Sequence, residues 1–211
     1  LKKDIVLENF KKILKYSKFK KLIYLSATSV YGDHQGEWVN EASKTKPTSL
    51  NGISRLNAEK SWLRLFNEFN LPVQVFRLSG IYSKQYNILN RLKKGEAKII
   101  KKKDQFFSRI HVEDIAKVLL KSITNFKKGE IYNISDDKPA SMEEVTRFAI
   151  KILNCKEPKT IQFTEIENEM LKNFYYDSKK VSNKKMKDFF NFKLKFPTYV
   201  EGLKYIYDQS F

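Results

Sequence analysis

The chain has 211 residues and a formal net charge of +17 at neutral pH. This length suits one sizeable domain with its own core better than two full domains. Cys155 is the only cysteine, so an intrachain disulfide is excluded and a reducing, cytoplasmic setting is favoured. No apolar run approaches the roughly 18 residues of a membrane-spanning helix, and we expect no membrane partner.

The positive charge is not concentrated in a way that indicates nucleic-acid binding. Only six of the 41 basic residues are Arg, whereas Arg forks are favoured for reading bases and phosphates. The lysines are spread from Lys2 to Lys204, and the densest run, 101–103, has three. A solvated lysine surface is the simpler interpretation, and a basic nucleic-acid-binding module stays as a third hypothesis.

The first half of the chain reads as helix, strand, helix, strand. Apolar residues recur at helical spacing over 5–17, and the apolar run 22–25 is typical of a strand buried on both faces. A polar stretch, 33–50, has the length of a functional loop. Helical spacing over 52–69 and the apolar run 73–78 complete a β–α–β unit, which predicts parallel strands.

The second half predicts further short elements. Helices are expected over 86–94 and 113–124, after a capping box that starts at Ser141, and over 199–207; strands are expected over 97–100, 106–112, 131–134 and 161–163. The expected fold class is therefore α/β, with a doubly wound parallel sheet and a small C-terminal α/β lobe.

Four segments match known motifs in the right order. Residues 24–32 read YLSATSVYG, residues 51–59 read NGISRLNAE, residues 107–116 read FSRIHVEDIA and residues 129–134 read GEIYNI. Together they resemble the extended short-chain dehydrogenase/reductases of the NAD-dependent epimerase/dehydratase superfamily. The resemblance runs from about Leu22 to Tyr207.

The resemblance implies a Rossmann-like fold that binds NAD or NADP. It assigns residues 1–140 to the C-terminal part of the nucleotide-binding domain, with a substrate-lobe insertion around 86–105, and residues 141–211 to a C-terminal substrate lobe. The sequence contains no glycine-rich phosphate turn of the family type. We therefore expect the N-terminal nucleotide-binding half to be missing from this chain.

All three catalytic positions of the family pattern are changed. Its Ser/Thr, Tyr and Lys fall on Ala27, Asn51 and Arg55. In the family, a phenol beside a lysine ammonium exchanges a proton while hydride moves to or from the nicotinamide. A carboxamide has no such proton, whereas Arg55 keeps the charge and can still hydrogen-bond a ribose. The chain thus resembles the atypical members that lack the Tyr and Lys, and Tyr31 is the candidate substitute phenol.

The same motifs assign a cofactor side and a substrate side. The cofactor side comprises Ser26, Ala27, Arg55, Leu78 and Gly80, and the substrate side comprises Thr28, Ser29, Phe107 and Arg109. Phe107 stands where the family has an Arg that holds a diphosphate, and an aromatic ring cannot replace a bidentate cation. Arg109, two positions on, can supply charge from a shifted position. We find no metal-ligand spacing.

Several of these residues also have structural explanations. Asn51, followed by glycine, suits a turn or a helix N-cap. Arg55 suits an exposed helix face, with Glu59 one turn further as its expected ion-pair partner. His111 is expected to be a packed histidine at a strand end, and His34 a surface residue.

The leading hypothesis is an NAD(P)-binding, epimerase/dehydratase-like oxidoreductase without the standard Ser/Thr–Tyr–Lys chemistry and with an unidentified small-molecule substrate. A non-catalytic protein that binds or senses a dinucleotide is the alternative from another class. The sequence leaves open whether the cofactor is NAD or NADP and whether the protein is a homodimer.

Overall fold

A parallel sheet lies at the centre of the molecule. The computed structural model describes residues 4–210, apart from the side chain of Met170. Within this range β1 (Leu22–Ala27), β3 (Val73–Leu78) and β7 (Ile131–Ile134) form one sheet in the order β1–β3–β7, and both pairs are parallel. The predicted parallel arrangement of these strands is confirmed.

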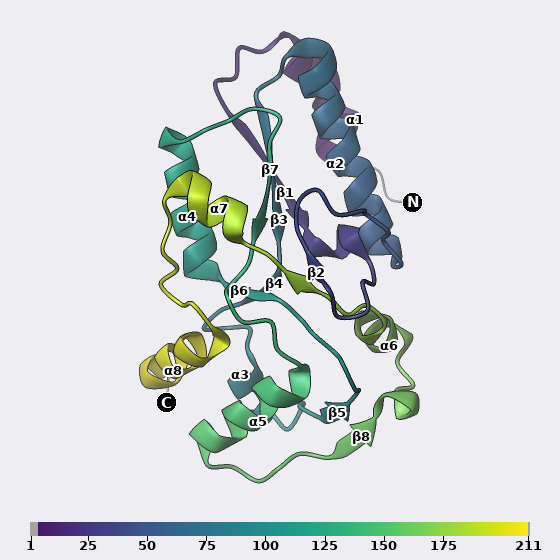
Figure 1. The fold of residues 1–211 in the computed structure, drawn as a ribbon, viewed down its shortest axis with the longest axis vertical. Coiled ribbons are helices and arrows are strands. Elements are labelled where there is room, and N and C mark those ends of the chain that lie inside the picture. Colours follow the sequence, from purple (N-terminus) through teal and green to yellow (C-terminus); the bar gives the residue numbers. More distant parts are fainter. Residues whose placement is uncertain (1–3, 211) are drawn as a thin grey trace.

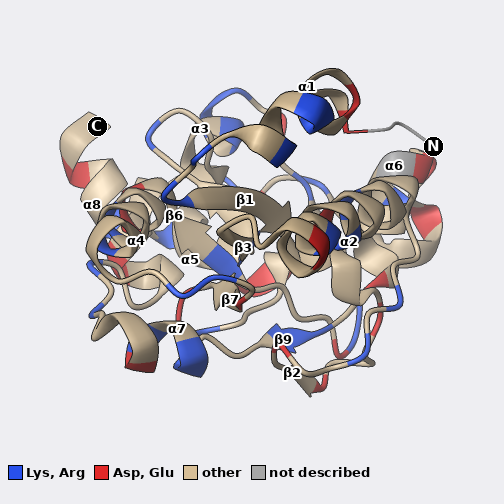
Figure 2. Cartoon of the chain, turned by 90° about the horizontal axis from the view of Figure 1, so that it is seen from above, with Lys and Arg blue, Asp and Glu red and all other residues tan. Residues whose placement is uncertain are grey.

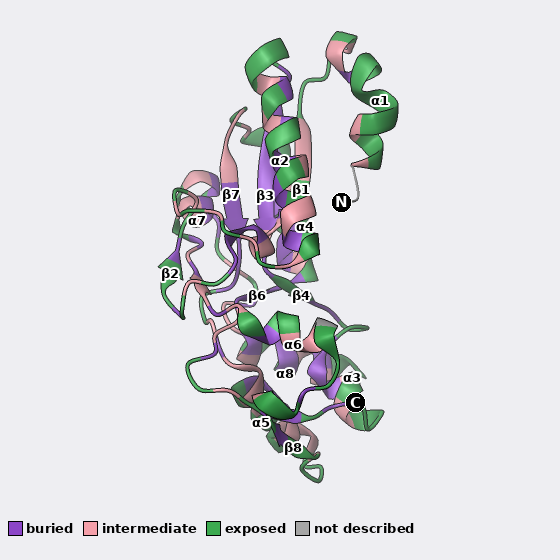
Figure 3. Ribbon diagram, turned by 90° about the vertical axis from the view of Figure 1, so that its right-hand side faces the viewer, coloured by how far each residue is buried: buried purple, intermediate pink, exposed green. Residues whose placement is uncertain are grey.

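The middle strand is buried, and four of its six residues are apolar. β3 reads VQVFRL, and its first five residues are buried, as expected for a strand covered on both faces. β1 pairs only with β3 among the described residues, and Leu25 on β1 is 39% exposed. Figure 3 shows this difference between the buried β3 and the less buried β1.

Helices cover both faces of the sheet (Figure 1). α1 (Ile5–Tyr16) and α2 (Leu50–Phe69) lie on one face, and α4 (Val112–Thr124) and α7 (Lys184–Phe190) lie on the other. Side chains alternate between the faces along a strand. Accordingly Val73 and Val75 pack with Trp62 of α2, whereas Phe76 points the other way and meets the ring of Phe190 in α7, with centroids 5.9 Å apart.

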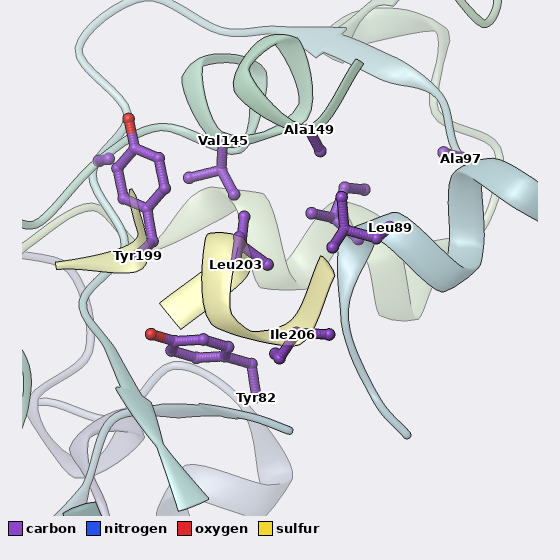
Figure 4. Packing of buried hydrophobic residues seen from close by; sticks show 10 residues of the cluster. Tyr82, Leu89, Ala97, Val145, Ala149, Tyr199, Leu203 and Ile206 are labelled. Atoms are coloured by element: carbon purple, nitrogen blue, oxygen red, sulfur yellow. The ribbon is translucent and has the colours of Figure 1, made fainter. Parts of the chain in front are cut away.

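A smaller lobe lies beyond the carboxyl ends of the sheet strands (Figure 1). It contains α3 (Ile88–Lys93), α5 (Met142–Leu153), α8 (Tyr199–Ser210) and the parallel pair of β5 (Ile99–Lys101) and β8 (Thr160–Gln162). Leu89, Val145 and Leu203, one from each helix, belong to a single apolar cluster (Figure 4). Three segments that are distant in sequence therefore share one core.

Short elements connect the sheet to this lobe. They are η1 (Thr28–Tyr31), β2 (Trp38–Val39), β4 (Gly80–Tyr82), β6 (Arg109–His111), η2 (Phe163–Glu165), α6 (Glu169–Tyr176) and β9 (Lys180–Val181). β4 pairs with β6 and β2 with β9, both in parallel. The backbone N–H of Lys180 donates to the Glu37 carbonyl at 2.9 Å, and that of Val181 donates to Ser108 Oγ at 2.9 Å. The segment that follows α6 is thereby fixed to both parts of the molecule.

The N-terminal helix is present as expected, but its apolar face is largely uncovered. Asp4 caps α1, because its Oδ1 accepts the backbone N–H of Leu7 at 3.0 Å. Leu14 is buried, whereas Ile5 and Ile13 are 71% and 60% exposed. No helix between residues 4 and 210 combines the length and apolar character needed to cross a membrane.

Candidate functional site

The candidate site lies where β1 and β3 end beside the first turn of α2. β1 runs directly into the η1 turn, where Thr28 and Ser29, both expected on the substrate side, are half-buried. Gly52 of α2 packs onto this turn, since a Cβ at Gly52 would lie 2.8 Å from the Ser29 carbonyl oxygen. The glycine therefore allows the helix to approach the backbone that follows Ala27.

A buried polar network joins the strand ends. The guanidinium of Arg77 in β3 forms an ion pair with Glu59 of α2, and its Nη1 donates to the Tyr31 hydroxyl at 2.9 Å. That hydroxyl donates to Asn133 Oδ1 at 2.8 Å, and Ser26 Oγ donates to Glu59 Oε2 at 2.9 Å. One network thus links α2, η1 and all three strands of the central sheet.

Tyr31 serves this network and is closed to solvent. Its side chain is fully buried, and desolvation raises the pKa of its phenol although the charge of Arg77 acts in the opposite direction. A general acid or base must reach the proton that it exchanges. The geometry therefore gives no support to Tyr31 as the substitute proton donor and supports a structural role instead.

Asn51 and Arg55 lie one turn apart on the same side of α2. Ser49 is the N-cap of this helix, so Asn51 sits inside the first turn and is not the cap. Both Asn51 and Arg55 are exposed. Arg55 Nη1 donates to the Leu25 carbonyl at 3.0 Å, two residues before Ala27. The structure thereby brings Arg55 to the end of β1.

Glu59 does not pair with Arg55, and that expectation was wrong. Its carboxylate is 2% exposed and accepts from Arg77 and Ser26. A carboxylate in the core needs a charged or hydrogen-bonding partner that is itself inside. Desolvation raises the pKa of the Tyr24 phenol, and the positive charge of the exposed Arg55 guanidinium acts in the opposite direction.

Leu78 and Gly80 mark the exit of the chain from the sheet. The backbone N–H of Ser79 donates to the Ile134 carbonyl, and that of Gly80 donates to the Ser108 carbonyl, both at 3.0 Å. Ser79 Oγ is buried and has no hydrogen-bond partner among the described residues. These bonds hold the ends of β3 and β7 beside β6.

Phe107 and Arg109 lie close together in the lobe, and the guanidinium of Arg109 is buried. Arg109 Nη1 donates to the carbonyl oxygens of Phe107 at 2.9 Å and Ala140 at 2.8 Å, and burial lowers the pKa of its guanidinium. The Phe107 ring stacks on Phe174 of α6, with centroids 4.3 Å apart. The residues expected on the substrate side thus present an aromatic stack, whereas the Arg109 guanidinium is bonded to backbone carbonyls.

Three buried polar atoms near the junction of sheet and lobe have no partner among the described residues. They are Asp136 Oδ2, the Tyr82 hydroxyl and His111 Nε2. Burial raises the pKa of Asp136 to about 8, and the charge of Arg109 acts against this rise. His111 is the packed histidine at a strand end that we expected, and its Nδ1 accepts the Glu113 N–H at 3.2 Å.

The buried network has signals in the sequence that the family motifs do not include. Arg77 interrupts an apolar strand run, and a charge inside such a run requires a buried partner. Glu59 falls at helical spacing from Leu56 and Trp62, two buried residues of the α2 face. Arg77 in a buried strand and Glu59 on a buried helix face carry opposite charges, and this combination predicts an internal ion pair.

The residues at the end of β1 fit a hydroxyl-rich or phosphate-bearing ligand through Arg55. A guanidinium has five N–H donors, and the bond of Arg55 to the Leu25 carbonyl leaves donors open on an exposed side chain. These suit the ribose oxygens of a dinucleotide. Ser26 Oγ is used internally, so Ser26 has only its backbone to offer.

A metal centre finds no ligand set in the described part of the chain. Between residues 4 and 210 no three His, Cys, Asp or Glu side chains are grouped for a metal ion. His34 is partly exposed, and its Nε2 lies 3.1 Å from the Lys44 carbonyl oxygen. Its contacts are those of a loop residue.

Comparison with known proteins places this arrangement in one family. Residues 6–135 match the sequence model of the NAD dependent epimerase/dehydratase family. A functionally unknown conserved protein from Silicibacter pomeroyi superposes with a TM-score of 0.93 at 36% identity, over 98% of this chain and 73% of that one. The dTDP-glucose 4,6-dehydratase of Bacillus anthracis in complex with NAD superposes with a TM-score of 0.76 at 22% identity, over 97% of this chain and 66% of that one. The expected Rossmann-like fold is confirmed.

Curated relatives are more distant and longer. The dTDP-D-glucose 4,6-dehydratase of Dictyostelium discoideum is 28% identical over 156 residues, which cover 64% of this chain and 36% of that protein. The ADP-L-glycero-D-manno-heptose-6-epimerase of Brachyspira hyodysenteriae is 24% identical over 160 residues, which cover 69% of this chain and 50% of that protein. The matched region therefore spans half or less of these relatives.

Proposed function

The chain belongs to the NAD dependent epimerase/dehydratase family, and we propose that it is an NAD(P)-binding oxidoreductase of the atypical short-chain dehydrogenase class. Its substrate in this proposal is a small molecule with a carbinol or carbonyl group. Asn51 and Arg55 stand in the positions of the family's Tyr and Lys, and Ala27 in that of its Ser/Thr. The cofactor is NAD or NADP, and the cellular setting is the cytoplasm.

The observation that carries this proposal is the placement of Arg55. Its guanidinium reaches the end of β1 at the Leu25 carbonyl and keeps open donors on an exposed side chain. The carboxyl ends of parallel strands are where open α/β sheets bind dinucleotides. A bound nicotinamide would supply hydride transfer. Arg55 would hold the adjoining ribose through charge-assisted hydrogen bonds.

Proton transfer is the weak step of this site. The carboxamide of Asn51 can donate a hydrogen bond to a substrate oxygen, but it does not exchange a proton near neutral pH. Loss of a positioned general acid or base costs about 10²- to 10⁴-fold in rate. The proposal therefore includes slow turnover unless the substrate brings its own acidic group.

Nucleotide sugars are disfavoured as substrates. Phe107 offers an aromatic face, and the nearby Arg109 is bonded to backbone carbonyls. Without an Arg guanidinium to hold the diphosphate, the binding free energy is weaker by about 1.5 to 3 kcal/mol. We expect a substrate without that group.

Cofactor binding is tested by fluorescence titration of the full-length protein with NADH and with NADPH. We expect Arg55→Ala to weaken binding by about tenfold, as for the loss of one charge-assisted hydrogen bond. Arg64→Ala is the matched control, because Arg64 lies on the same helix with its side chain 70% exposed. Equal affinities in both variants and the parent would contradict the role of Arg55.

Turnover is tested with a panel of UDP-, GDP- and dTDP-sugars and simple carbonyl compounds, followed by nicotinamide absorbance. We expect no ordinary epimerase or dehydratase turnover of the sugars by the unmodified full-length protein. The double variant Asn51→Tyr, Arg55→Lys restores the phenol and the point charge, and its rate is expected to rise. Robust turnover of nucleotide sugars by the parent would overturn the proposal.

A non-catalytic dinucleotide-binding or sensing protein is the second candidate. The burial of Tyr31 favours it, because this phenol, the substitute proton donor that we considered, is enclosed by protein. Tight NADH or NADPH binding without an absorbance change for any carbonyl compound would decide for this candidate. A basic nucleic-acid-binding module is the third candidate. A homodimer also stays a prediction, which analytical ultracentrifugation can test.

A further inference from the structure

A buried cluster of hydrogen-bond donors lies where the sheet meets the lobe. Its members are Arg109 of β6, Tyr82 of β4 and Asp136, which follows β7. β4 and β6 pair with Gly80 opposite Arg109, and the Asp136 N–H donates to the Arg109 carbonyl at 2.7 Å. All three side chains of the cluster are buried. The backbone therefore fixes these residues near one another and away from solvent.

Arg109 carries a buried positive charge without a partner of opposite charge. Its Nη1 donates to two backbone carbonyls, and its Nη2 lies 3.0 Å from the sulfur of Met142, which is a weak acceptor. Within the described part of the chain its guanidinium forms no ion pair. A buried guanidinium is costly unless a counter-charge compensates it. The cluster therefore lacks a negative group.

Tyr82 and Asp136 add two hydroxyl donors that also lack an acceptor. The Tyr82 hydroxyl and Asp136 Oδ2 are buried and have no hydrogen-bond partner in the described structure. Burial raises the pKa of Asp136 to about 8, so its carboxyl group is protonated at neutral pH. Its Oδ1 accepts the Lys138 N–H at 3.3 Å, which leaves Oδ2 to carry the proton. All three groups of the cluster are thus donors.

The three groups also act on one another electrostatically. Burial raises the pKa of both Tyr82 and Asp136, and the positive charge of Arg109 acts in the opposite direction for each. Tyr82 packs against α8 (Figure 4), since a Cβ at Gly202 would lie 2.0 Å from its hydroxyl oxygen. Because electrostatic effects fade with distance, these mutual effects place the three groups in one neighbourhood between the sheet and α8.

The carboxylates that surround the cluster do not supply the missing charge. Four of them act on its members. Each is held by other groups: Asp137 by Lys187, Glu144 by Lys138, Asp114 by the backbone N–H groups of Lys195 and Phe196, and Glu201 by Thr198. An anion from outside the chain is therefore the group that would complete the cluster.

We propose that a small monovalent anion binds between Arg109, Tyr82 and Asp136 and joins the sheet to the lobe. The guanidinium supplies the counter-charge, and the two O–H groups donate hydrogen bonds to the anion. A water molecule fits less well, because it accepts hydrogen bonds but brings no negative charge to the guanidinium. A halide and a small carboxylate share this chemistry, so the test includes both. The inference does not depend on the proposed function.

The test measures the thermal unfolding midpoint of the full-length protein at fixed ionic strength and neutral pH. Sodium gluconate, whose anion is bulky, is replaced stepwise by sodium chloride, bromide or formate. An anion that binds only the folded state raises the midpoint in a saturable way, whereas general screening depends on ionic strength alone. Fixed ionic strength therefore separates binding at one site from screening of the whole surface.

Two variants test the donors. Tyr82→Phe removes one O–H group and keeps the ring, and we expect it to weaken chloride binding by about tenfold, as for one lost hydrogen bond. Tyr86→Phe is the matched control, because Tyr86 is 81% exposed. The parent protein should lose chloride binding above about pH 8, where Asp136 ionises and repels an anion. Asp136→Asn does not ionise, so its chloride binding should not change across this pH.

Saturable stabilisation by chloride or bromide that Tyr82→Phe weakens and Tyr86→Phe leaves unchanged supports an inorganic anion. Stronger stabilisation by formate, with the same response to the variants, supports a carboxylate at the same place. The proposal is overturned if all these anions give the same midpoint at equal ionic strength, or if Tyr82→Phe responds as the parent does. Crystals grown with bromide give a second readout that needs no variant. We expect an anomalous scattering peak beside Arg109, and an ordered water there in its place would contradict the anion.

Discussion

The hydroxyl of Tyr31 sits between two partners that are themselves buried. It accepts from Arg77 and donates to Asn133, and all three side chains are at most 4% exposed. Water cannot replace a hydrogen bond that is lost at such a place. At the scale of single residues, the buried polar groups therefore stabilise the fold, whereas Asn51 and Arg55 are exposed and available to a ligand.

We predict that Tyr31→Phe destabilises the protein without changing its fold. The variant leaves Asn133 Oδ1 and one N–H of Arg77 without a partner, which costs about 1 to 3 kcal/mol. Urea unfolding measures the loss, and Tyr86→Phe on an exposed tyrosine is the control. Unchanged stability together with loss of turnover would instead mark Tyr31 as a catalytic residue.

We predict that Asp136→Asn stabilises the protein at neutral pH. Burial raises the pKa of Asp136 to about 8, whereas an unfolded Asp titrates near 4. Between these values the folded state holds a proton that the unfolded state has released, so stability falls as pH rises from about 4 to 8. The Asn side chain does not titrate, so the variant lacks this loss of stability with rising pH.

The measurement is urea unfolding of the parent and of Asp136→Asn across that pH window. The parent should lose stability with rising pH relative to the variant, and the gap should close below about pH 4. Parallel curves for the two proteins would show that Asp136 is ionised at neutral pH in the folded state.

At the residue scale, the sequence motifs predict where a residue lies but not which residue it pairs with. The family motifs placed Arg55 at the end of β1, where the structure has it. They did not show that Glu59 turns inward to Arg77, because helical spacing alone also allows a surface pair with Arg55. Which partner wins depends on the distance between α2 and β3, which is a tertiary property.

Between elements, the pair of Glu59 and Arg77 fixes α2 on the sheet. We predict that Glu59→Gln costs about 3 to 5 kcal/mol, because it leaves a buried guanidinium without its counter-charge. Glu68→Gln on the same helix is the matched control. Its pair with Arg64 has an N–O distance of 3.9 Å and is largely exposed, so the loss should be below about 1 kcal/mol. Similar losses in both variants would contradict the buried pair.

The long elements follow from the sequence, and the short ones do not. The apolar runs of β1, β3 and β7 and the helical spacing of α2 and α4 predicted their positions within a few residues. β2, β4, β9, α6 and α7 were missed. β2 and β9 have two residues each, too few for a periodic pattern. α7 reads KKMKDFF, and its burial depends on the rings of β3 and β7 that it meets.

Over the whole molecule, exposed positive charge surrounds a core in which a buried ion pair joins α2 to the sheet. Figure 2 shows Lys and Arg on helices and loops around the chain and not on one face alone. The net charge of +17 means that these groups repel one another on average. Repulsion between exposed charges is screened by salt, whereas the buried pair of Glu59 and Arg77 is screened far less.

We therefore predict that sodium chloride stabilises the protein. The Debye length falls from about 30 Å at 0.01 M to about 8 Å at 0.15 M ionic strength, so the midpoint of thermal unfolding should rise over this range and then level off. The difference between the parent and Glu59→Gln should stay constant, because it arises from a pair with side chains only 4% and 2% exposed. Scanning calorimetry measures both quantities. A midpoint that falls with added salt would show that attractive surface pairs outweigh the excess of lysine.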